Sequence, residues 1–387
     1  MRGAAMKLGF LLFDYFPFGG LERDCLHIAS ACVARGHSIT IFTRSWEGER
    51  PANITVELFG RHGLANTSRN RHWLKQLAAT LSQRELDCVV GFNKLPGLDV
   101  YYGADPCFAA KINESKPLWY RWLPRGRQLL ELERAVFARG AKTEILLLAS
   151  RDIVNYQKIY GTENNRFHVL PPNAVRRSFT HEQQLAARRR IRETNGWSPT
   201  DKLLLFVGSD FRRKGLARAI RGLAALDTAA REQTQLAVLG KCDPGGLVRL
   251  ARNLGVAKRV HFLGGRTDAP DWMLAADALV HPARSETAGA VLVEALASHL
   301  PIIVSGVCGY AFHVERAKAG AVLCEPFQQE EFNRALRTAL EPSTSRQWRA
   351  NAAAYAAGNE LYGCHERAAE IIEAVALRKQ GRRSGGV

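Results

Sequence analysis

The strongest constraint on the fold is an alternation of strand-like and helix-like segments that occurs twice, once on each side of a pair of prolines. In the first half, short apolar runs at residues 8–13, 38–43, 88–91 and 144–149 alternate with segments of helical periodicity. The second half restarts with apolar runs at residues 202–207, 236–239, 260–263, 278–280 and 302–305. Strands that alternate with helices pair in parallel and are covered by helices on both faces. We therefore predict an α/β protein with two doubly wound, Rossmann-like domains that face a central cleft.

Pro171 and Pro172 mark the predicted domain boundary, because proline cannot continue a helix or an inner strand. We expect an N-terminal domain over residues 1–172 and a C-terminal domain over residues 173–359. A last helix at about residues 360–378 is expected, and it could pack back on the N-terminal domain. The basic, glycine-rich residues 379–387 are expected to form a disordered tail. Residues 1–5 precede Met6, which also looks like a natural start.

The charge balance points to anionic partners. The chain has 387 residues, with 54 lysines and arginines against 37 aspartates and glutamates, so its formal net charge is +17. Such an excess suits nucleic acid, a phosphorylated substrate or an anionic membrane surface. The eight cysteines are scattered without CxxC spacing, which indicates a reduced, cytosolic protein. No apolar run approaches the roughly 18 residues of a membrane-spanning helix.

Two carboxylates near the end of the apolar run at residues 278–280 form the first candidate site. Glu286 is placed where a strand gives way to a helix, and Glu294 is placed inside that helix. Helix starts bind anions because their first amide hydrogens have no partner within the helix. A carboxylate beside such a start suits a ligand with hydroxyls and phosphates, such as a sugar nucleotide. The alternative is a surface helix with two solvated glutamates, because such a spacing recurs by chance.

Two loops at predicted strand ends carry further candidates. Arg213 and Lys214 follow the strand at residues 202–207, where cations suit a diphosphate, although a solvated basic turn is the alternative. Gly19 and Gly20 follow the first strand and would let a ligand approach the backbone, or would simply form a tight turn. Asp24 lies one turn into the next helix and could face the same site. The sequence has no DxD motif and no His/Asp cluster, so we expect no metal and no cofactor, with cations and helix amides neutralising a leaving group.

A stretch at residues 108–137 mixes basic and aromatic side chains. Its candidate acceptor or membrane contacts are Lys111, Lys116, Trp119, Tyr120, Arg121, Trp122, Arg125 and Arg127. Basic residues with interfacial aromatics suit shallow insertion into an anionic membrane surface. Two alternatives are a solvated loop with its aromatics on the core and a nucleic-acid surface.

Taken together, these motifs resemble the retaining glycosyltransferases of family four, which have the GT-B fold. The resemblance rests on the Glu286-x7-Glu294 pair, the Arg213-Lys214 loop and the Gly19-Gly20 turn. Four segments, at residues 15–24, 91–101, 207–211 with 214–215, and 307–311, resemble a narrower group, the heptose glucosyltransferases of lipopolysaccharide core synthesis. The resemblance extends from Lys7 to about Ala374.

The resemblance implies an activity and a set of partners. The expected reaction is the metal-independent transfer of glucose from UDP-glucose to the inner-core heptose of lipopolysaccharide, as an α-1,3 linkage with retention of configuration. Front-face attack would need no separate protein nucleophile. The stretch at residues 108–137 would dock the enzyme on the anionic inner face of the inner membrane, so the protein would be cytoplasmic and peripheral, with no nucleic acid as a partner.

The resemblance also implies residue roles. Gly19 and Gly20 would lie against the donor phosphate and sugar, and Arg213 and Lys214 would hold the diphosphate. Glu286, with the backbone of the residues after it, would position the glucose. The other implied contacts are Ala288, Gly289 and Ala290 to the donor, Glu294 to the ribose, Arg266 to the uridine, and Asp24 and Asp105 to the acceptor hydroxyl.

The sequence departs from the group at one position and leaves alternatives open. Asn173 stands where relatives often have glycine after the two prolines, and the arginine near the donor phosphate could be Arg176 or Arg177. Another UDP-sugar or another glycolipid acceptor on the same fold is one alternative. The other is a basic nucleic-acid-binding or membrane-binding protein on an inactive scaffold.

Overall fold

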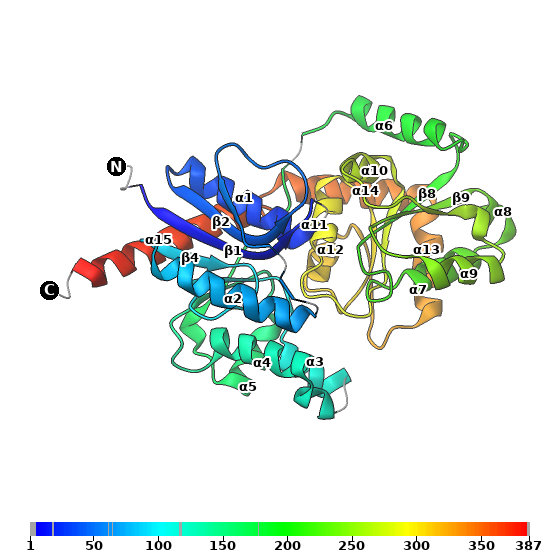
Figure 1. Ribbon diagram of the computed structural model, residues 1–387. Coiled ribbons are helices and arrows are strands. Elements are labelled where there is room, and N and C mark those ends of the chain that lie inside the picture. Colours follow the sequence, from blue (N-terminus) through cyan, green and yellow to red (C-terminus); the bar gives the residue numbers. More distant parts are fainter. Residues whose placement is uncertain are drawn as a thin grey trace. The chain divides into compact units, whose positions relative to one another are not determined.

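The computed structural model describes residues 5–17, 19–60, 62–63, 65–115, 118–176 and 178–384. The chain divides into two compact units (Figure 1). Unit 1 comprises Met1–Pro171 and Gly363–Val387, and unit 2 comprises Pro172–Tyr362. The division falls beside the proline pair, one residue from the boundary expected from the sequence. Lys116 and Arg177 lie outside the described residues.

Unit 1 is built on a parallel sheet of seven strands in the order β3-β2-β1-β4-β5-β6-β7. The strands are β1 (Lys7–Tyr15), β2 (Ser38–Trp46), β3 (Thr55–Leu58), β4 (Cys88–Gly91), β5 (Val100–Gly103), β6 (Glu144–Leu147) and β7 (Phe167–Val169). The helices are α1 (Gly20–Ala34), α2 (Asn66–Ser82), α3 (Phe108–Ser115), α4 (Pro124–Phe137), α5 (Ile153–Tyr160) and α15 (Cys364–Ser384), with short 3-10 turns η1 (Leu118–Trp122), η2 (Ser150–Asp152) and η3 (Asn164–Arg166). Helix α15, from the far end of the chain, packs on α1 and β4.

Unit 2 is built on a parallel sheet of six strands in the order β10-β9-β8-β11-β12-β13. The strands are β8 (Lys202–Val207), β9 (Thr234–Leu239), β10 (Val260–Phe262), β11 (Ala278–His281), β12 (Ile302–Ser305) and β13 (Gly320–Leu323). The helices are α6 (His181–Thr194), α7 (Leu216–Ala224), α8 (Thr228–Glu232), α9 (Gly245–Asn253), α10 (Ala269–Ala275), α11 (Ala290–Ala297), α12 (Ala311–Ala317), α13 (Gln329–Leu340) and α14 (Pro342–Ala357), with the turn η4 (Ala257–Arg259).

The central strands are buried along most of their length because helices cover both faces of each sheet. All four residues of β4, β5, β11 and β12 are buried. In unit 2, Phe206, Leu236 and Ile220 from the sheet and α7 pack with Phe332 of α13 in one core. In unit 1, Trp73 of α2 and Phe137 of α4 belong to the corresponding core. These two separate cores confirm the prediction of two doubly wound α/β units.

Each sheet contains one point where the strand order reverses. In unit 1 the chain runs outward from β1 to β3 and then returns to place β4 on the other side of β1. In unit 2 it runs from β8 to β10 and returns to place β11 beside β8. Loops that leave two such neighbouring strands diverge to opposite faces and leave room for a ligand at the carboxyl ends. The candidate loops after β1, β8 and β11 all lie at these positions.

Two sequence expectations need correction. Helix α15 continues to Ser384, so residues 379–384 are helical rather than part of a disordered tail. Its later turns are tied to the sheet side of unit 1, because Lys379 Nζ lies 2.6 Å from the Asp99 carboxylate and Arg378 lies 2.7 Å from Glu144. Residues 124–137 form helix α4, so the basic aromatic stretch is not a loop throughout. Among the described residues, no helix combines the length and apolarity needed to cross a membrane.

Candidate functional site

The reversal of strand order in unit 2 brings two of the candidate loops together. The loop after β8 carries Arg213 and Lys214, and the loop after β11 carries Glu286. The Arg284 backbone N–H donates to the Arg213 carbonyl at 2.7 Å, which joins the two loops directly. The sequence separation of more than seventy residues is therefore closed by the pairing of β8 with β11.

Glu286 lies between the two cations of the β8 loop. Arg213 donates from Nη1 to Glu286 Oε1 at 3.0 Å, and Lys214 donates from Nζ to Glu286 Oε2 at 2.8 Å. Arg213 also donates to the Ser285 carbonyl and contacts Asp210. The structure thus brings together three residues that the sequence predicted for one site. We refer to Arg213, Lys214 and Glu286 as the cation–carboxylate cluster.

Two glycines make this close approach possible. Gly215 has a φ of +80°, and a Cβ built on it would lie 1.9 Å from the Pro282 carbonyl oxygen at the end of β11. A Cβ on Gly208 would lie 2.2 Å from Cδ of Lys214, so the lysine side chain crosses directly over this glycine. A positive φ and a close backbone contact are both conditions that favour glycine. The cluster depends on both glycines for its geometry.

The electrostatics of the cluster keep Glu286 ionised. Burial opposes ionisation of this carboxyl, but the positive charges of Lys214 and Arg213, which both donate to it, favour the charged form and hold its pKa far below its ordinary value. The pKa of Arg213 is raised, because Glu286 and Asp210 outweigh the effect of burial. Two adjacent cations at the end of β8 suit an anionic ligand that competes with Glu286 and Asp210 for them.

His281 is a site residue that the sequence did not single out. It is the last residue of β11, it is fully buried, and its Nε2 lies 3.6 Å from Glu286 Oε2. Neither ring nitrogen has a hydrogen-bond partner. Burial, with the charges of Lys214 and Arg213, lowers its pKa and outweighs the opposing effect of Glu286, so the ring is neutral at neutral pH. The apolar run before Glu286 concealed it, since a lone histidine at a strand end carries no motif.

The second glutamate of the acidic pair lies in helix α11. Gly289, with a φ of +88°, precedes the first helical residue Ala290, and Glu294 is half-buried inside the helix. The Ala288 carbonyl accepts from the Tyr310 backbone N–H at 2.8 Å, which fixes the turn between Glu286 and the helix. Glu286 therefore stands in the turn that leads into α11, and Glu294 lies within the helix, as the sequence predicted.

Two arginines expected near the donor make other contacts. Arg266 makes a bidentate ion pair with Asp268, with both nitrogen–oxygen distances at 2.7 Å. Arg176 donates to the Gly358 carbonyl and to Asn359, and its guanidinium lies 4.1 Å from the ring centre of Tyr362. Arg266 and Arg176 are thus engaged in local contacts, in contrast to the pair in the cation–carboxylate cluster.

In unit 1, the glycine pair lies at the start of α1, with Gly19 as the N-cap. Glu22 folds back over this start, since a Cβ on Gly19 would lie 1.7 Å from Glu22 Oε2. Gly20 has open space where a Cβ would stand. Glu22 is 8% exposed, and burial, supported by the charges of Asp105, Asp14 and Asp24, raises its pKa to about 7. Nothing in the sequence singles out Glu22, because a glutamate in the first turn of a helix is an ordinary feature.

In the structure, Asp24 has partners from distant segments of unit 1. This residue is 6% exposed. Its Oδ2 accepts from the Tyr102 hydroxyl at 2.7 Å, and its Oδ1 lies 3.1 Å from His365 Nε2. The carboxylate therefore links α1 to β5 and to α15, a structural role that the sequence did not predict. The long separation from His365 in the chain hid this role.

Asp105 lies at a different position in unit 1. It is exposed, and it lines a cavity of about 230 Å³ at the carboxyl ends of the central strands. The other lining residues are Phe13, Asn93, Lys94, Pro106, Phe108, Lys111, Leu129 and Leu132. One wall is fixed by buried Glu133, which accepts from the Phe108 and Ala109 backbone N–H groups and pairs with Lys94. Aromatic faces next to carboxylate and amide groups suit a sugar ring.

The stretch at residues 108–137 presents aromatic side chains to solvent. Trp119 is 61% exposed and Trp122 is 83% exposed. Arg121, Arg125 and Arg127 are exposed in the same stretch, and Tyr120 is half-buried. Trp122 and Arg127 also line a cavity of about 360 Å³ that Arg71 of α2 borders. The aromatics do not all pack on the domain core, which argues against the simplest alternative for this stretch.

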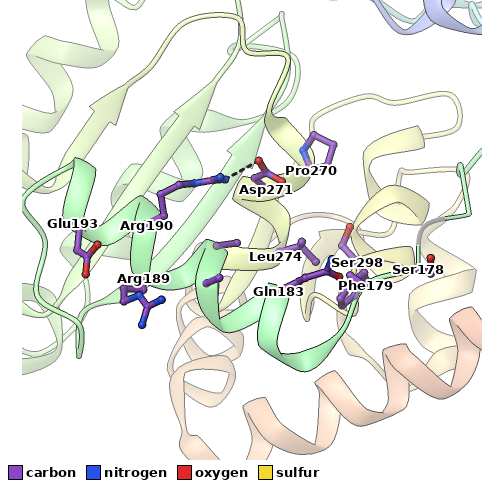
Figure 2. Close-up of a pocket in the computed structure, with 12 residues that line it drawn as sticks. Ser178, Phe179, Gln183, Arg189, Arg190, Glu193, Pro270, Asp271, Leu274 and Ser298 are labelled. Carbon is purple, nitrogen blue, oxygen red and sulfur yellow. Dashed lines mark hydrogen bonds and ion pairs between the residues drawn. The ribbon is translucent and has the colours of Figure 1, made fainter.

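Another pocket in unit 2 lies apart from the predicted residues. This pocket has a volume of about 720 Å³ and is lined by residues of α6 and α10. Figure 2 shows the lining residues and the ion pair between Arg190 and Asp271. None of its lining residues belongs to the cation–carboxylate cluster. No group of three or more His, Cys, Asp or Glu side chains arranged to hold a metal ion occurs in the part of the chain that the structure describes.

The fold and the cluster define a class: a GT-B protein, with two parallel-sheet α/β units and the cation–carboxylate cluster at the strand reversal of the second. Residues 187–355 match the family described as glycosyl transferases group 1. A lipopolysaccharide glucosyltransferase, WaaG, from Escherichia coli (strain K12) is 43% identical over 368 residues, covering 95% of this chain and 98% of that protein. The chain therefore belongs to the group 1 glycosyltransferases.

Solved structures support this membership. A crystal structure of WaaG, described as a glycosyltransferase involved in lipopolysaccharide biosynthesis, matches with a TM-score of 0.89 and 42% identity, covering 94% of this chain and 99% of that one. A structure of the Anabaena protein HepE in complex with UDP and glucose matches with a TM-score of 0.72 and 18% identity, covering 98% and 100% of the two chains. The second match shows the fold alone. Together with the two parallel sheets, the first confirms the predicted GT-B fold.

Proposed function

We propose that this glycosyltransferase transfers glucose from UDP-glucose to the inner-core heptose of lipopolysaccharide. The observation that carries the proposal is the near full-length similarity to a lipopolysaccharide glucosyltransferase, combined with the cation–carboxylate cluster at the strand reversal of unit 2. The relative's name supplies the sugar and the acceptor class. The cluster supplies the chemistry that a nucleotide-sugar donor needs.

The donor site of the proposal lies in unit 2. Lys214 and Arg213 hold the diphosphate, because a diphosphate carries more negative charge than the Glu286 carboxylate with which both cations pair in the free protein. Glu286, kept ionised, accepts hydrogen bonds from hydroxyls of the glucose. Glu294 binds the ribose hydroxyls from within α11, and the amides of Gly289 and Ala290 face the anion at the start of this helix. Arg266 borders the uridine, and its pairing with Asp268 fixes its position.

The transfer is proposed to proceed with retention and without a metal. The bond between the anomeric carbon and the phosphate oxygen breaks while the acceptor hydroxyl oxygen bonds to the same face of that carbon. The acceptor's proton passes to the leaving phosphate oxygen, and the products are UDP and an α-1,3-glucosylated heptose. Arg213 and Lys214 stabilise the charge on the leaving diphosphate.

The acceptor site of the proposal lies in unit 1, at the cavity that Asp105 borders. A heptose ring would lie against Phe13 and Phe108, with Asp105 orienting the reacting hydroxyl. The open backbone at Gly20 would face phosphate or sugar, and Glu22 at Gly19 would meet the ligand as a carboxyl that is about half protonated near pH 7.

Docking on a membrane completes the proposal. Exposed Trp119 and Trp122, with Arg121, Arg125 and Arg127 around them, suit the interface of an anionic bilayer. The acceptor is a lipid-anchored saccharide, so the enzyme would work as a peripheral protein at the cytoplasmic face of the inner membrane.

The test is incubation of the purified protein with labelled UDP-glucose and heptose-terminated core lipopolysaccharide, with chelator in one arm. Transfer that is undiminished by chelator, with an α-linked product by nuclear magnetic resonance, supports the proposal. An absolute requirement for Mg²⁺ would overturn the metal-independent mechanism. Parallel reactions with UDP-galactose and UDP-N-acetylglucosamine decide the donor sugar.

The same purified protein can be used to distinguish the proposed glycosyltransferase from the non-enzymatic alternative. A nucleic-acid-binding protein on an inactive scaffold would bind RNA or DNA in a salt-sensitive manner, and UDP would leave its melting temperature unchanged. A rise in melting temperature with UDP, without retention of a labelled oligonucleotide at 150 mM salt, would exclude that alternative.

A further inference from the structure

We propose that His281 is a positioning residue. Its Nε2–H donates a hydrogen bond to the Glu286 carboxylate when Lys214 and Arg213 leave that carboxylate to bind the donor diphosphate. The inference rests on the proposed function, because it describes the same site in its occupied state. Its starting point is a buried histidine whose two ring nitrogens have no hydrogen-bond partner.

An unpartnered buried imidazole is costly. Burial of a polar group without a hydrogen bond destabilises a protein, and a neutral histidine has one donor and one acceptor to satisfy. The ring of His281 is covered on one side by Phe206, with ring centres 6.4 Å apart, and its Nε2 faces Glu286 Oε2 at 3.6 Å. That separation is too long for a hydrogen bond, but an approach of less than 1 Å would make one. The ring therefore points at the carboxylate with its donor unused.

The contacts of Glu286 explain why the donor is unused in the free protein. Lys214 occupies Oε2 at 2.8 Å, and Arg213 occupies Oε1 at 3.0 Å. A diphosphate carries more negative charge than one carboxylate and competes for both cations. When Lys214 moves toward the phosphate, Oε2 would be left buried and without a partner, which is expensive for an ionised group.

His281 is placed to remove that cost. It is the neutral ring beside Oε2, because burial and the charges of Lys214 and Arg213 lower its pKa. A neutral ring with its proton on Nε2 donates to Oε2 without adding a charge that would compete for the diphosphate. Glu286 then stays ionised and oriented toward the hydroxyls of the donor sugar. His281 touches neither substrate nor leaving group in this arrangement and acts only through Glu286.

The experiment compares three substitutions. His281→Gln places an amide nitrogen near the position of Nε2, His281→Asn places it near Nδ1, and His281→Leu removes both nitrogens. The readouts are the UDP-glucose dissociation constant by calorimetry, the kcat and KM of transfer, and the melting temperature with and without UDP-glucose.

The expected result is a separation of binding from stability. In H281L and H281N, donor affinity falls on the order of tenfold to hundredfold, as for loss of a hydrogen bond to a charged group. H281Q keeps affinity within about threefold of the native protein. The melting temperature of free H281L is equal to or above that of the native protein, because no hydrogen bond is lost in the free state, while its rise on addition of UDP-glucose shrinks.

His313 supplies the matched control. It is buried in α12 of the same unit, its Nε2 also has no partner, and its Nδ1 bonds the Tyr355 hydroxyl. H313L should lower the melting temperature and leave donor affinity unchanged. Donor affinity of H281L equal to that of the native protein, or equal losses in H281Q and H281L, would overturn the proposal. Native protein that binds no UDP-glucose would instead reject the proposed function, so the two failures are distinguishable.

Discussion

The two units handle a buried carboxyl in opposite ways. In unit 2, Glu286 is surrounded by Arg213, Lys214 and His281, and its pKa is far below the ordinary value. In unit 1, Glu22 is buried among carboxylates, and its pKa is raised to about 7. The same side chain is thus a permanent anion in one unit and a group that titrates near neutral pH in the other. Neighbouring charge, rather than burial alone, decides which state a buried carboxyl adopts.

The largest expected effect comes from removing one of the cations that face Glu286 in unit 2. We expect Lys214→Ala to lower kcat/KM for glucose transfer on the order of 10²–10³-fold, because the leaving diphosphate and Glu286 both lose a partner. Steady-state assays with UDP-glucose measure it. Lys258→Ala, at an exposed position in η4, should leave the rate unchanged. A K214A rate close to native would remove Lys214 from the mechanism.

The next effect tests two aspartates of unit 1 against each other. Asp24→Ala removes a buried carboxylate that Tyr102 and His365 bond, and we expect a loss of about 3 kcal/mol in the free energy of unfolding. Asp105→Ala, at an exposed position, should change stability by less than about 0.5 kcal/mol while lowering the transfer rate. Urea denaturation measures the stability of both variants, and transfer assays measure their rates. Equal stabilities for D24A and D105A would contradict the structural role of Asp24.

The third expected effect is a dependence of stability on pH that comes from Glu22 and that Glu286 should not show near neutral pH. The folded-state pKa of Glu22 is above its unfolded value, so its contribution to stability is fully present below about pH 4.5 and is lost as pH rises through about 7. The Glu22→Gln side chain cannot ionise. At pH 8.5 the free energy of unfolding of this variant should therefore exceed that of the native protein by about 2 kcal/mol. The two proteins should converge near pH 4.5.

Denaturation curves between pH 4.5 and 8.5 measure this difference. Glu85→Gln, at an exposed position of unit 1, is the control and should follow the native curve throughout. If E22Q also follows the native curve, Glu22 ionises in the folded protein as easily as in the unfolded one, and the comparison between the units fails.

The smallest effect concerns the surface of unit 1. Replacing Trp119 and Trp122 together by serine should lower partitioning onto anionic vesicles roughly tenfold, because the apolar area available for insertion is lost. Stability should change little, since both side chains are mostly exposed. Vesicle sedimentation measures it, with Val154→Ser, exposed in α5, as the control. Undiminished vesicle binding would show that the docking surface does not depend on Trp119 and Trp122.

Much of the fold was predictable because local signals and the global topology agree. Strands β4, β8 and β12 begin and end where the apolar runs place them. Strand β5, residues 100–103, was missed because its four residues include two tyrosines and a glycine, and only burial in the sheet identifies it. Helix α4 was missed because its first turn holds a proline and a glycine among arginines, and it is stabilised by tertiary contacts such as those of Glu133.

The sequence by itself determined which residues meet at the strand reversal of unit 2. An alternating βα pattern sets a parallel sheet, and the residues after β8 and β11 are then neighbours, so Arg213, Lys214 and Glu286 could be assigned to one site. Only the tertiary structure decided the state of each group. Asp24 became a structural link because His365 arrives from the end of the chain, Glu22 became titratable because burial and other carboxylates surround it, and His281 acquired a role because its ring is enclosed beside Glu286. These properties depend on desolvation and on contacts between distant segments, which no local pattern encodes.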